Sequence, residues 1–90
     1  MRRKTEKDLK NMLDEAAKLV TVGGRYRHAK SGGEYALVDL AFLEASEEVA
    51  VIYRREYGAD KFLWARSLAV FLEEVEIDGV RRPRFEEIKS

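Results

Sequence analysis

The segment EYALVDLAFLEASEEVAVIYRRE, residues 34–56, contains two apolar runs separated by a short polar return. Almost every residue over 34–44 except Asp39 is apolar, which predicts a long strand covered on both of its faces. Residues 45–47 predict the return, and the β-branched residues over 48–56 predict a second strand. The segment therefore indicates a β-rich domain whose strands follow one another closely.

Turn residues divide the flanking sequence into further short elements. Before the quoted segment, residues 25–29 predict a strand and residues 31–33 predict a turn. After it, residues 62–66 predict another strand, and residues 67–72 predict a tight corner or a single helical turn. Short strands and tight turns thus alternate on both sides of the segment.

A hairpin is predicted in the last part of this pattern. Asp78 and Gly79 are a strong signal for a two-residue hairpin turn, with residues 75–77 leading into it and residues 80–85 returning. Pro83 suits only the edge or the end of a strand, because proline has no amide N–H to donate. About five short strands joined by tight turns predict a mainly β fold, a small SH3-like barrel.

A helical pattern precedes the strands. Its apolar residues recur at the spacing of one helix face and are Leu9, Met12, Leu13, Ala16, Ala17 and Val20. The spacing predicts an amphipathic α-helix over residues 6–20, with Thr5 as the N-cap and Asp8 completing a variant of the capping box. Gly23 and Gly24 are expected to end it. Because so short a helix is marginal in isolation, its apolar stripe should lie against the barrel or, alternatively, against a second chain.

Length and composition indicate one domain with an N-terminal extension. A chain of 90 residues, of which 46% are hydrophobic, can build one small core. We expect residues 1–23 to form the helical extension and residues 24–90 to form the barrel domain. No repeat or linker composition divides the chain further.

Several kinds of chemistry are absent from this sequence. Without cysteine, disulfides and thiolate metal sites are excluded, and the single histidine, His28, cannot build a zinc site alone. No apolar run has the length of a signal peptide or of a membrane span. We therefore expect a cytoplasmic protein with no metal, no cofactor and no membrane partner.

Charge is balanced overall but unevenly distributed along the chain. Seventeen basic and seventeen acidic residues give a net charge of zero. Residues 1–30 hold nine Lys and Arg against four Asp and Glu, and residues 31–90 hold eight against thirteen. The basic beginning could attract an anionic partner. The neutral total argues against a dedicated nucleic-acid binder, which is usually strongly basic.

Four short motifs occur in a fixed order along the strands. They are GxYRHxK at residues 24–30, VIYRxxYG at 51–58, LWxRxLxxF at 63–71 and DGxxxPRF at 78–85. Together they resemble the bacterial domain of unknown function 1653 family, over about 62 of the 90 residues. The resemblance implies an SH3-type barrel in a small bacterial protein and assigns no activity. One position departs from it, because Ser67 stands where the family usually has proline.

Aromatic and basic residues of these motifs form the candidate ligand-binding surface. Residues at alternate positions of adjacent strands share a face, so several of these side chains could converge. Such a surface stacks bases or peptide rings and pairs with carboxylate or phosphate. The candidate residues are Tyr26, Arg27, His28, Lys30, Tyr53, Arg54, Tyr57, Trp64 and Arg66.

A structural role is the alternative for the same residues. The aromatic rings could instead form the barrel core, an interpretation that we favour for Trp64 and Tyr35. The arginines would then pair across strands with carboxylates such as Glu34, Glu56 and Asp60.

No catalytic constellation is recognisable in the chain. His28 is the one side chain that ordinarily titrates near neutral pH, but no partner nucleophile or carboxylate is identifiable from spacing. We therefore expect a non-catalytic binding module for a peptide, a protein or an anionic small ligand. The alternatives are an RNA or single-stranded DNA binder and, less favoured, an enzyme that uses His28. The protein is expected to be a monomer or a weak homodimer through its N-terminal helix.

Overall fold

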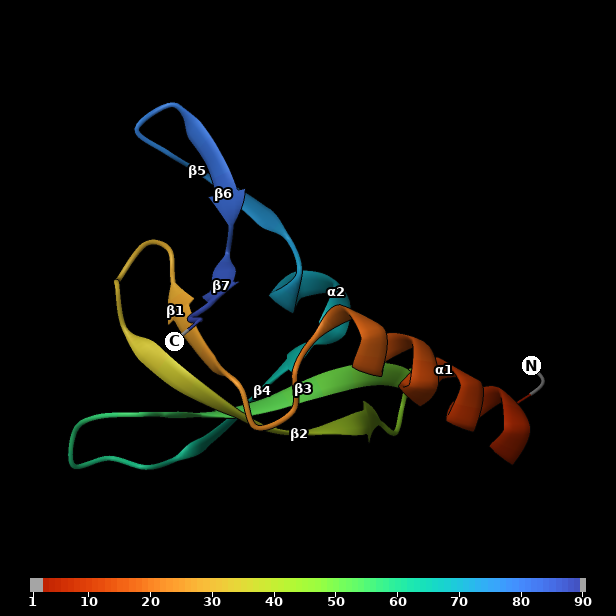
Figure 1. Cartoon of the computed structure of the whole chain (residues 1–90). Helices are drawn as coiled ribbons and strands as arrows, with labels where there is room; N and C mark the ends of the chain where they lie inside the picture. The colour runs from red at the N-terminus through yellow and green to blue at the C-terminus, as the bar shows by residue number, and fades with distance from the viewer. Residues whose placement is uncertain (1–2, 90) are drawn as a thin grey trace.

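A five-stranded antiparallel sheet is the centre of the computed structural model, which describes residues 3–89 (Figure 1). Its strands lie in the order β4-β3-β2-β1-β7. Their bounds are β1 Arg25–His28, β2 Glu34–Leu43, β3 Glu48–Arg55, β4 Leu63–Ser67 and β7 Phe85–Glu87. The predicted mainly β class is confirmed. Over the described residues the hydrogen-bonded order has β4 and β7 as its two edges, so the sheet is open and does not close into a barrel.

The strand β2 changes its alternation at a bulge. The pairing of β2 with β3 shifts between Leu37 and Asp39, which leaves Val38 without an opposite residue. Leu37 is buried, whereas Val38 is 37% exposed. The prediction that both faces of this strand are covered was therefore wrong. The strand is apolar at consecutive positions because the bulge moves the inward-facing residues from one alternation to the other.

The N-terminal helix begins at the predicted capping box. In α1, Glu6–Leu19, the hydroxyl of Thr5 accepts from the amide of Asp8, and the Asp8 carboxylate accepts from the amide of Thr5, each at 3.1 Å. The helix ends at Leu19, one residue earlier than predicted and before the two glycines. The confirmed capping box satisfies amides of the first turn that would otherwise lack partners.

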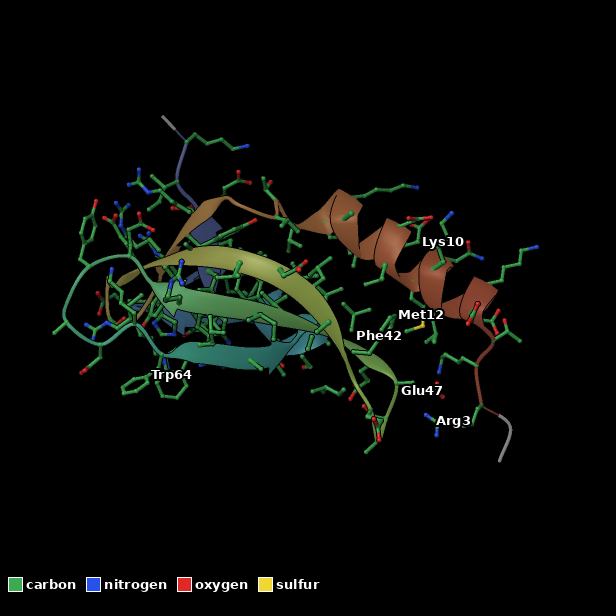
Figure 2. The ribbon with its side chains drawn as sticks, turned by 90° about the horizontal axis from the view of Figure 1, so that it is seen from below. Arg3, Lys10, Met12, Phe42, Glu47 and Trp64 are labelled. Atoms are coloured by element: carbon green, nitrogen blue, oxygen red, sulfur yellow. The ribbon has the colours of Figure 1, made fainter. Side chains whose placement is uncertain are left out.

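The helix lies along the ends of the strands and extends beyond the sheet (Figure 1). Ala16 is buried where α1 contacts β3, and Met12 points toward the region of Phe42 (Figure 2). Just before the helix, Arg3 forms an ion pair with Glu47 of the β2–β3 turn at 3.8 Å. Leu19, by contrast, is 60% exposed. The helix is thus only partly covered by its own chain.

The corner after β4 is a capped helical turn. The predicted single turn is confirmed as α2, Leu68–Phe71, in which Phe71 is buried and Leu68 packs against the core. The hydroxyl of Ser67 accepts a hydrogen bond from the amide of Val70 at 3.2 Å. Ser67 therefore caps the turn at the position where the resemblance led us to expect proline.

The predicted hairpin forms a separate two-stranded sheet. It consists of β5, Glu74–Ile77, and β6, Val80–Pro83, and it projects away from the main sheet (Figure 1). Asp78 and Gly79 have φ values of 52° and 79°. Positive φ at both central residues is what a two-residue hairpin turn of this kind requires, and glycine adopts it without strain.

The core lies between the sheet, α2 and the end of α1. Its buried members are Val20, Tyr26, Leu37, Val51, Tyr53, Phe71 and Phe85. Most of these residues come from the central strands, where neighbours on both sides exclude water. Within residues 3–89, no helix has both the length and the apolar character needed to cross a bilayer.

Candidate ligand-binding site

The strand register divides the candidate residues between two faces of the sheet. Residues directly opposite each other on paired strands lie on the same face. The pairs that define this arrangement are His28 with Phe85, Tyr26 with Tyr35, Leu37 with Tyr53, Tyr53 with Trp64, and Val51 with Arg66. We call the face that carries these residues the aromatic face. The opposite side, the outer face, carries Arg25, Arg27, Glu34, Arg54, Leu63 and Glu86.

Phe85 is the centre of the aromatic face. Its ring stacks on Phe71, with ring centroids 4.4 Å apart and planes only 9° apart. The rings of His28, Tyr53 and Tyr35 meet it edge-on, with centroid distances of 5.0, 5.4 and 5.9 Å. Edge-to-face contacts of this kind stabilise aromatic clusters beyond the area that they bury. The cluster therefore gives the site a rigid apolar floor.

Arg66 lies on this floor with its guanidinium group fixed. The guanidinium carbon lies 5.5 Å from the centroid of the Phe85 ring, and Nε donates a hydrogen bond to the hydroxyl of Tyr53 at 3.0 Å. Within residues 3–89, Arg66 forms no ion pair with a carboxylate. A cation held over an aromatic ring keeps its charge and its terminal N–H groups for another acceptor.

Arg84 adds a second guanidinium group, only 22% exposed, beside β7. Its Nη2 donates to the carboxylate of Glu73 at 2.9 Å. Its Nε is buried and has no hydrogen-bond partner among the described residues. A buried donor without an acceptor is destabilising by about 1–3 kcal/mol, and more where the donor is charged. This nitrogen therefore lacks one acceptor.

His28 is the titratable group of the aromatic face. Its Nδ1 accepts a hydrogen bond from the backbone amide of Ser31 at 3.3 Å. Because that amide can only donate, Nδ1 carries no proton in this contact, and the neutral ring holds its proton on Nε2. Burial lowers the pKa of His28 below 6.5, and the nearby charges of Arg66, Arg84 and Lys30 lower it further. Burial and these three cations thus oppose protonation of the imidazole.

Of the other candidates, Tyr26 packs edge-on against Phe71 in the core, whereas Arg54 and Tyr57 lie apart from this cluster. Tyr26 is 5% exposed, and its hydroxyl accepts from the amide of Thr21 at 2.9 Å, which ties the end of α1 to the sheet. Arg54 is exposed on the outer face, and Tyr57 is 64% exposed in the β3–β4 turn. Of the nine candidate residues, the aromatic face therefore carries Tyr26, His28, Tyr53, Trp64 and Arg66, and the charge of Lys30 also acts on His28.

Trp64 is exposed, whereas the structural alternative predicted that it is buried in the core. The ring is 52% exposed and projects from β4 (Figure 2). β4 pairs with β3 on one side only, and no described strand lies on its other side. The interpretation of Trp64 as a core residue was therefore wrong, whereas Tyr35 is half-buried against Tyr53 and Phe85.

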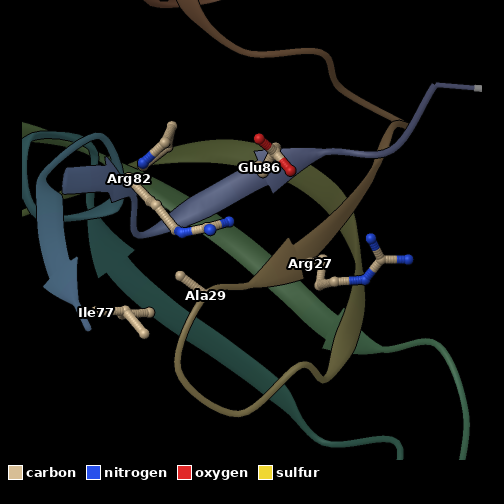
Figure 3. Close-up of a pocket in the computed structure, with 6 residues that line it drawn as sticks. Arg27, Ala29, Ile77, Arg82 and Glu86 are labelled. Atoms are coloured by element: carbon tan, nitrogen blue, oxygen red, sulfur yellow. The ribbon is translucent and has the colours of Figure 1, made fainter. Parts of the chain in front are cut away.

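Arg27 lies in a different environment on the outer face. Its guanidinium pairs with Glu34 at 3.3 Å, as the structural alternative proposed for an arginine of this surface. It also lines a small pocket of about 190 Å³ with Arg82 and Glu86, between the main sheet and the hairpin (Figure 3). Arg27 and Arg66 therefore cannot act on the same ligand atoms.

Sequence reasoning missed Arg84 and Phe85 as members of the site. Both were quoted within the motif DGxxxPRF, but their partners lie far away in the sequence. Only the pairing of β7 with β1 brings Phe85 opposite His28. In residues 3–89, no cluster of three or more histidine or carboxylate side chains is arranged to hold a metal ion.

Comparison with known proteins identifies the family. A family model described as a protein of unknown function (DUF1653) matches residues 24–87. The chain belongs to this family. A crystal structure of a DUF1653 protein from Bordetella bronchiseptica is similar, with 33% sequence identity and a TM-score of 0.65, over 73% of this chain and 85% of that chain. No curated protein matches. The matched DUF1653 region contains all the strands and α2, and therefore the whole aromatic face, but not α1.

Proposed function

We propose that the protein is a non-catalytic binding module whose aromatic face holds the anionic group, carboxylate or phosphate, of a small ligand. The observation that carries this proposal is the state of Arg66. Its guanidinium is fixed by Tyr53 and Phe85 but has no carboxylate partner among residues 3–89. A preorganised guanidinium loses little side-chain entropy when it takes a bidentate anion.

The surroundings of Arg66 support an anionic ligand over a cationic one. Besides burial, the charges of Arg66, Arg84 and Lys30 lower the pKa of His28, so three cations act at this place although the net charge of the chain is zero. Glu73 is bound to Arg84, which leaves the excess positive charge on the other two. The buried Nε of Arg84 is a donor that a ligand oxygen or a water molecule could satisfy.

The chemistry of His28 supports binding without catalysis. Its Nδ1 is occupied by the Ser31 amide, and the Ser31 hydroxyl lies 3.2 Å from the same nitrogen. The surrounding cations oppose protonation, so the ring is a poor acceptor for a proton from a substrate. We assign His28 the role of a neutral neighbour that packs on Phe85.

A titration followed by NMR tests the proposal on the full chain. Inorganic phosphate and acetate are the probes, and the readouts are the pKa of His28 and the Nε–H resonance of Arg66. Bound phosphate should raise the pKa of His28, because a neighbouring negative charge favours the imidazolium form. Arg66→Gln should abolish this response. The matched control, Arg54→Gln, removes the same charge from the outer face and should leave the response intact.

The same variants report on the site without any ligand. Removing Arg66 removes one of the charges that hold down the pKa of His28, so Arg66→Gln should raise that pKa in the free protein. Arg54→Gln should not. The proposal would be refuted if phosphate shifted the pKa of His28 equally in the wild-type protein and in Arg66→Gln. It would also be refuted if Arg66→Gln and Arg54→Gln lost the phosphate response to the same extent.

A single-stranded nucleic acid is the second candidate ligand, and the exposure of Trp64 favours it. The ring lies on the aromatic face two residues from Arg66, and a stacked base beside a bound phosphate would use both groups. A short oligonucleotide would then shift the Trp64 indole resonance strongly at about 50 mM salt and weakly at about 200 mM salt. Phosphate binding without any oligonucleotide response would leave the small-ligand proposal and remove this one.

A further inference from the structure

The outer edge of β4 is unprotected, unlike the other edge of the sheet. β7 spans only three residues, two of them Glu86 and Glu87, and the hydroxyl of Thr21 bonds to Glu87 at 3.2 Å. β4 spans five residues and carries Arg66 as its single charge. Exposed edge strands usually carry charges, prolines or covering segments, because an open row of amide and carbonyl groups recruits other strands. β4 has little of this protection.

Several exposed apolar side chains lie at this edge of the sheet. Phe62 is 64% exposed, Leu63 60% and Trp64 52%, and Tyr57 of the preceding turn is 64% exposed. Leu63 and Trp64 project to opposite faces of the sheet, so the apolar residues surround the edge on both sides. A patch of this kind on a sheet edge is typical of a surface that pairs with another chain.

We propose that β4 pairs with β4 of a second copy, antiparallel about a twofold axis at Ala65, to form one sheet across two subunits. In this register Trp64 lies opposite the partner's Arg66, and Leu63 lies opposite the partner's Ser67. Each Trp64 ring then meets a guanidinium group, which is a favourable cation–π pair. The short side chain of Ala65 lies at the axis against its own copy.

Two other registers are less favourable for this strand. A shift by one residue in the pairing would place opposite residues on different faces, which antiparallel hydrogen bonding does not allow. An axis at Arg66 would place two guanidinium groups directly opposite each other, which is destabilising. The axis at Ala65 is thus the register in which the two charges and the two indole rings complement each other.

A charge-swap experiment tests this register by sedimentation analysis from micromolar to millimolar concentration. Ala65 is exposed on the outer face, so Ala65→Lys and Ala65→Glu should each leave the fold intact, which an amide NMR spectrum checks. Each variant places like charges opposite each other at the axis and should weaken dimerisation by about tenfold or more. An equimolar mixture of the two variants should restore the dimer as a heterodimer.

The control variant addresses the other exposed apolar surface. Leu19→Lys changes the exposed side of α1 and should leave dimerisation unchanged. A wild-type protein that stays monomeric throughout, loss of the dimer in Leu19→Lys, or a mixture of the Ala65 variants that stays monomeric would each overturn the proposal. The test needs no ligand, so its outcome is separate from that of the phosphate titration.

Discussion

The hydroxyl oxygen of Tyr53 accepts a hydrogen bond from Nε of Arg66 at 3.0 Å. Tyr53 is 7% exposed, whereas Arg66 is half-buried at the edge strand. A core residue of β3 therefore sets the position of the Arg66 guanidinium group on β4. The aromatic floor and the guanidinium group form one unit, so a change in the core should alter the site that we propose for an anion.

Removing that hydroxyl should weaken both the fold and the binding of phosphate. Tyr53→Phe keeps the ring and its contacts but takes away the acceptor for Arg66. We expect the free energy of unfolding to fall by about 1–2 kcal/mol, because the lost hydrogen bond involves a charged donor. Phosphate affinity should also fall, since the guanidinium would no longer be held in place. Urea denaturation and the phosphate titration measure the two effects; unchanged affinity would show that Tyr53 does not position Arg66.

The pKa of His28 predicts how stability changes with pH. Burial first, and then Arg66, Arg84 and Lys30, lower this pKa in the folded protein below 6.5. The unfolded chain thus binds the proton more tightly. The free energy of unfolding should therefore decrease as the pH falls from 6.5 toward the lower folded-state pKa. Above 6.5, His28 is unprotonated in both the folded and the unfolded chain, so this destabilisation is absent.

A variant without the imidazole isolates this effect from the carboxylates. His28→Asn should show a flatter dependence of the free energy of unfolding on pH between about pH 5 and pH 8 than the wild-type protein. Chemical denaturation at several pH values gives both curves. Parallel curves would mean that His28 titrates alike in the folded and unfolded chains.

Phe85 should be the most sensitive position of the aromatic face. Its ring is 6% exposed and contacts Phe71, Tyr53 and His28. Phe85→Ala should reduce the free energy of unfolding by about 3–5 kcal/mol, through lost transfer free energy and a residual cavity. The control, Phe62→Ala, removes an exposed ring and should change it by only about 0.5 kcal/mol or less. Similar losses in the two variants would contradict the central role of Phe85.

The cap of α2 gives a smaller and separate prediction. Ser67→Ala removes the oxygen that accepts from the Val70 amide, and it should reduce the free energy of unfolding by about 1 kcal/mol. Ser67→Asp retains a capping acceptor and should lose less. Thermal denaturation compares the three proteins. If the alanine and aspartate variants were equally destabilised, the loss would not come from the cap.

Local patterns in the sequence predicted most of the individual elements. The capping box at Thr5, the turn at Asp78 and the helical turn at Leu68 depend on neighbouring residues, and the structure confirms them. The bulge at Val38 was not predicted, because a single unpaired residue leaves no distinctive composition. Its effect was instead interpreted as a strand covered on both faces.

The site was predicted less well than the strands that carry it. Strict alternation could have separated Arg27 from its neighbours Tyr26 and His28, since adjacent strand residues lie on opposite faces. The presence of Arg84 and Phe85 could not be predicted in this way. Their place depends on a pairing between the two ends of the sheet region, and sequence patterns do not determine which distant strands pair.

The pairing of β1 with β7 joins the first and the last strand of the chain. β1, β2, β3 and β4 each pair with a neighbour in the sequence, whereas the pairing of β1 with β7 needs residues 85–87, and contacts between such distant segments form slowly. Until Phe85 arrives, the rings of Tyr53 and Phe71 have no partner at the centre of the cluster. A chain that lacked β7 would leave these rings more exposed to water and would be more prone to aggregate.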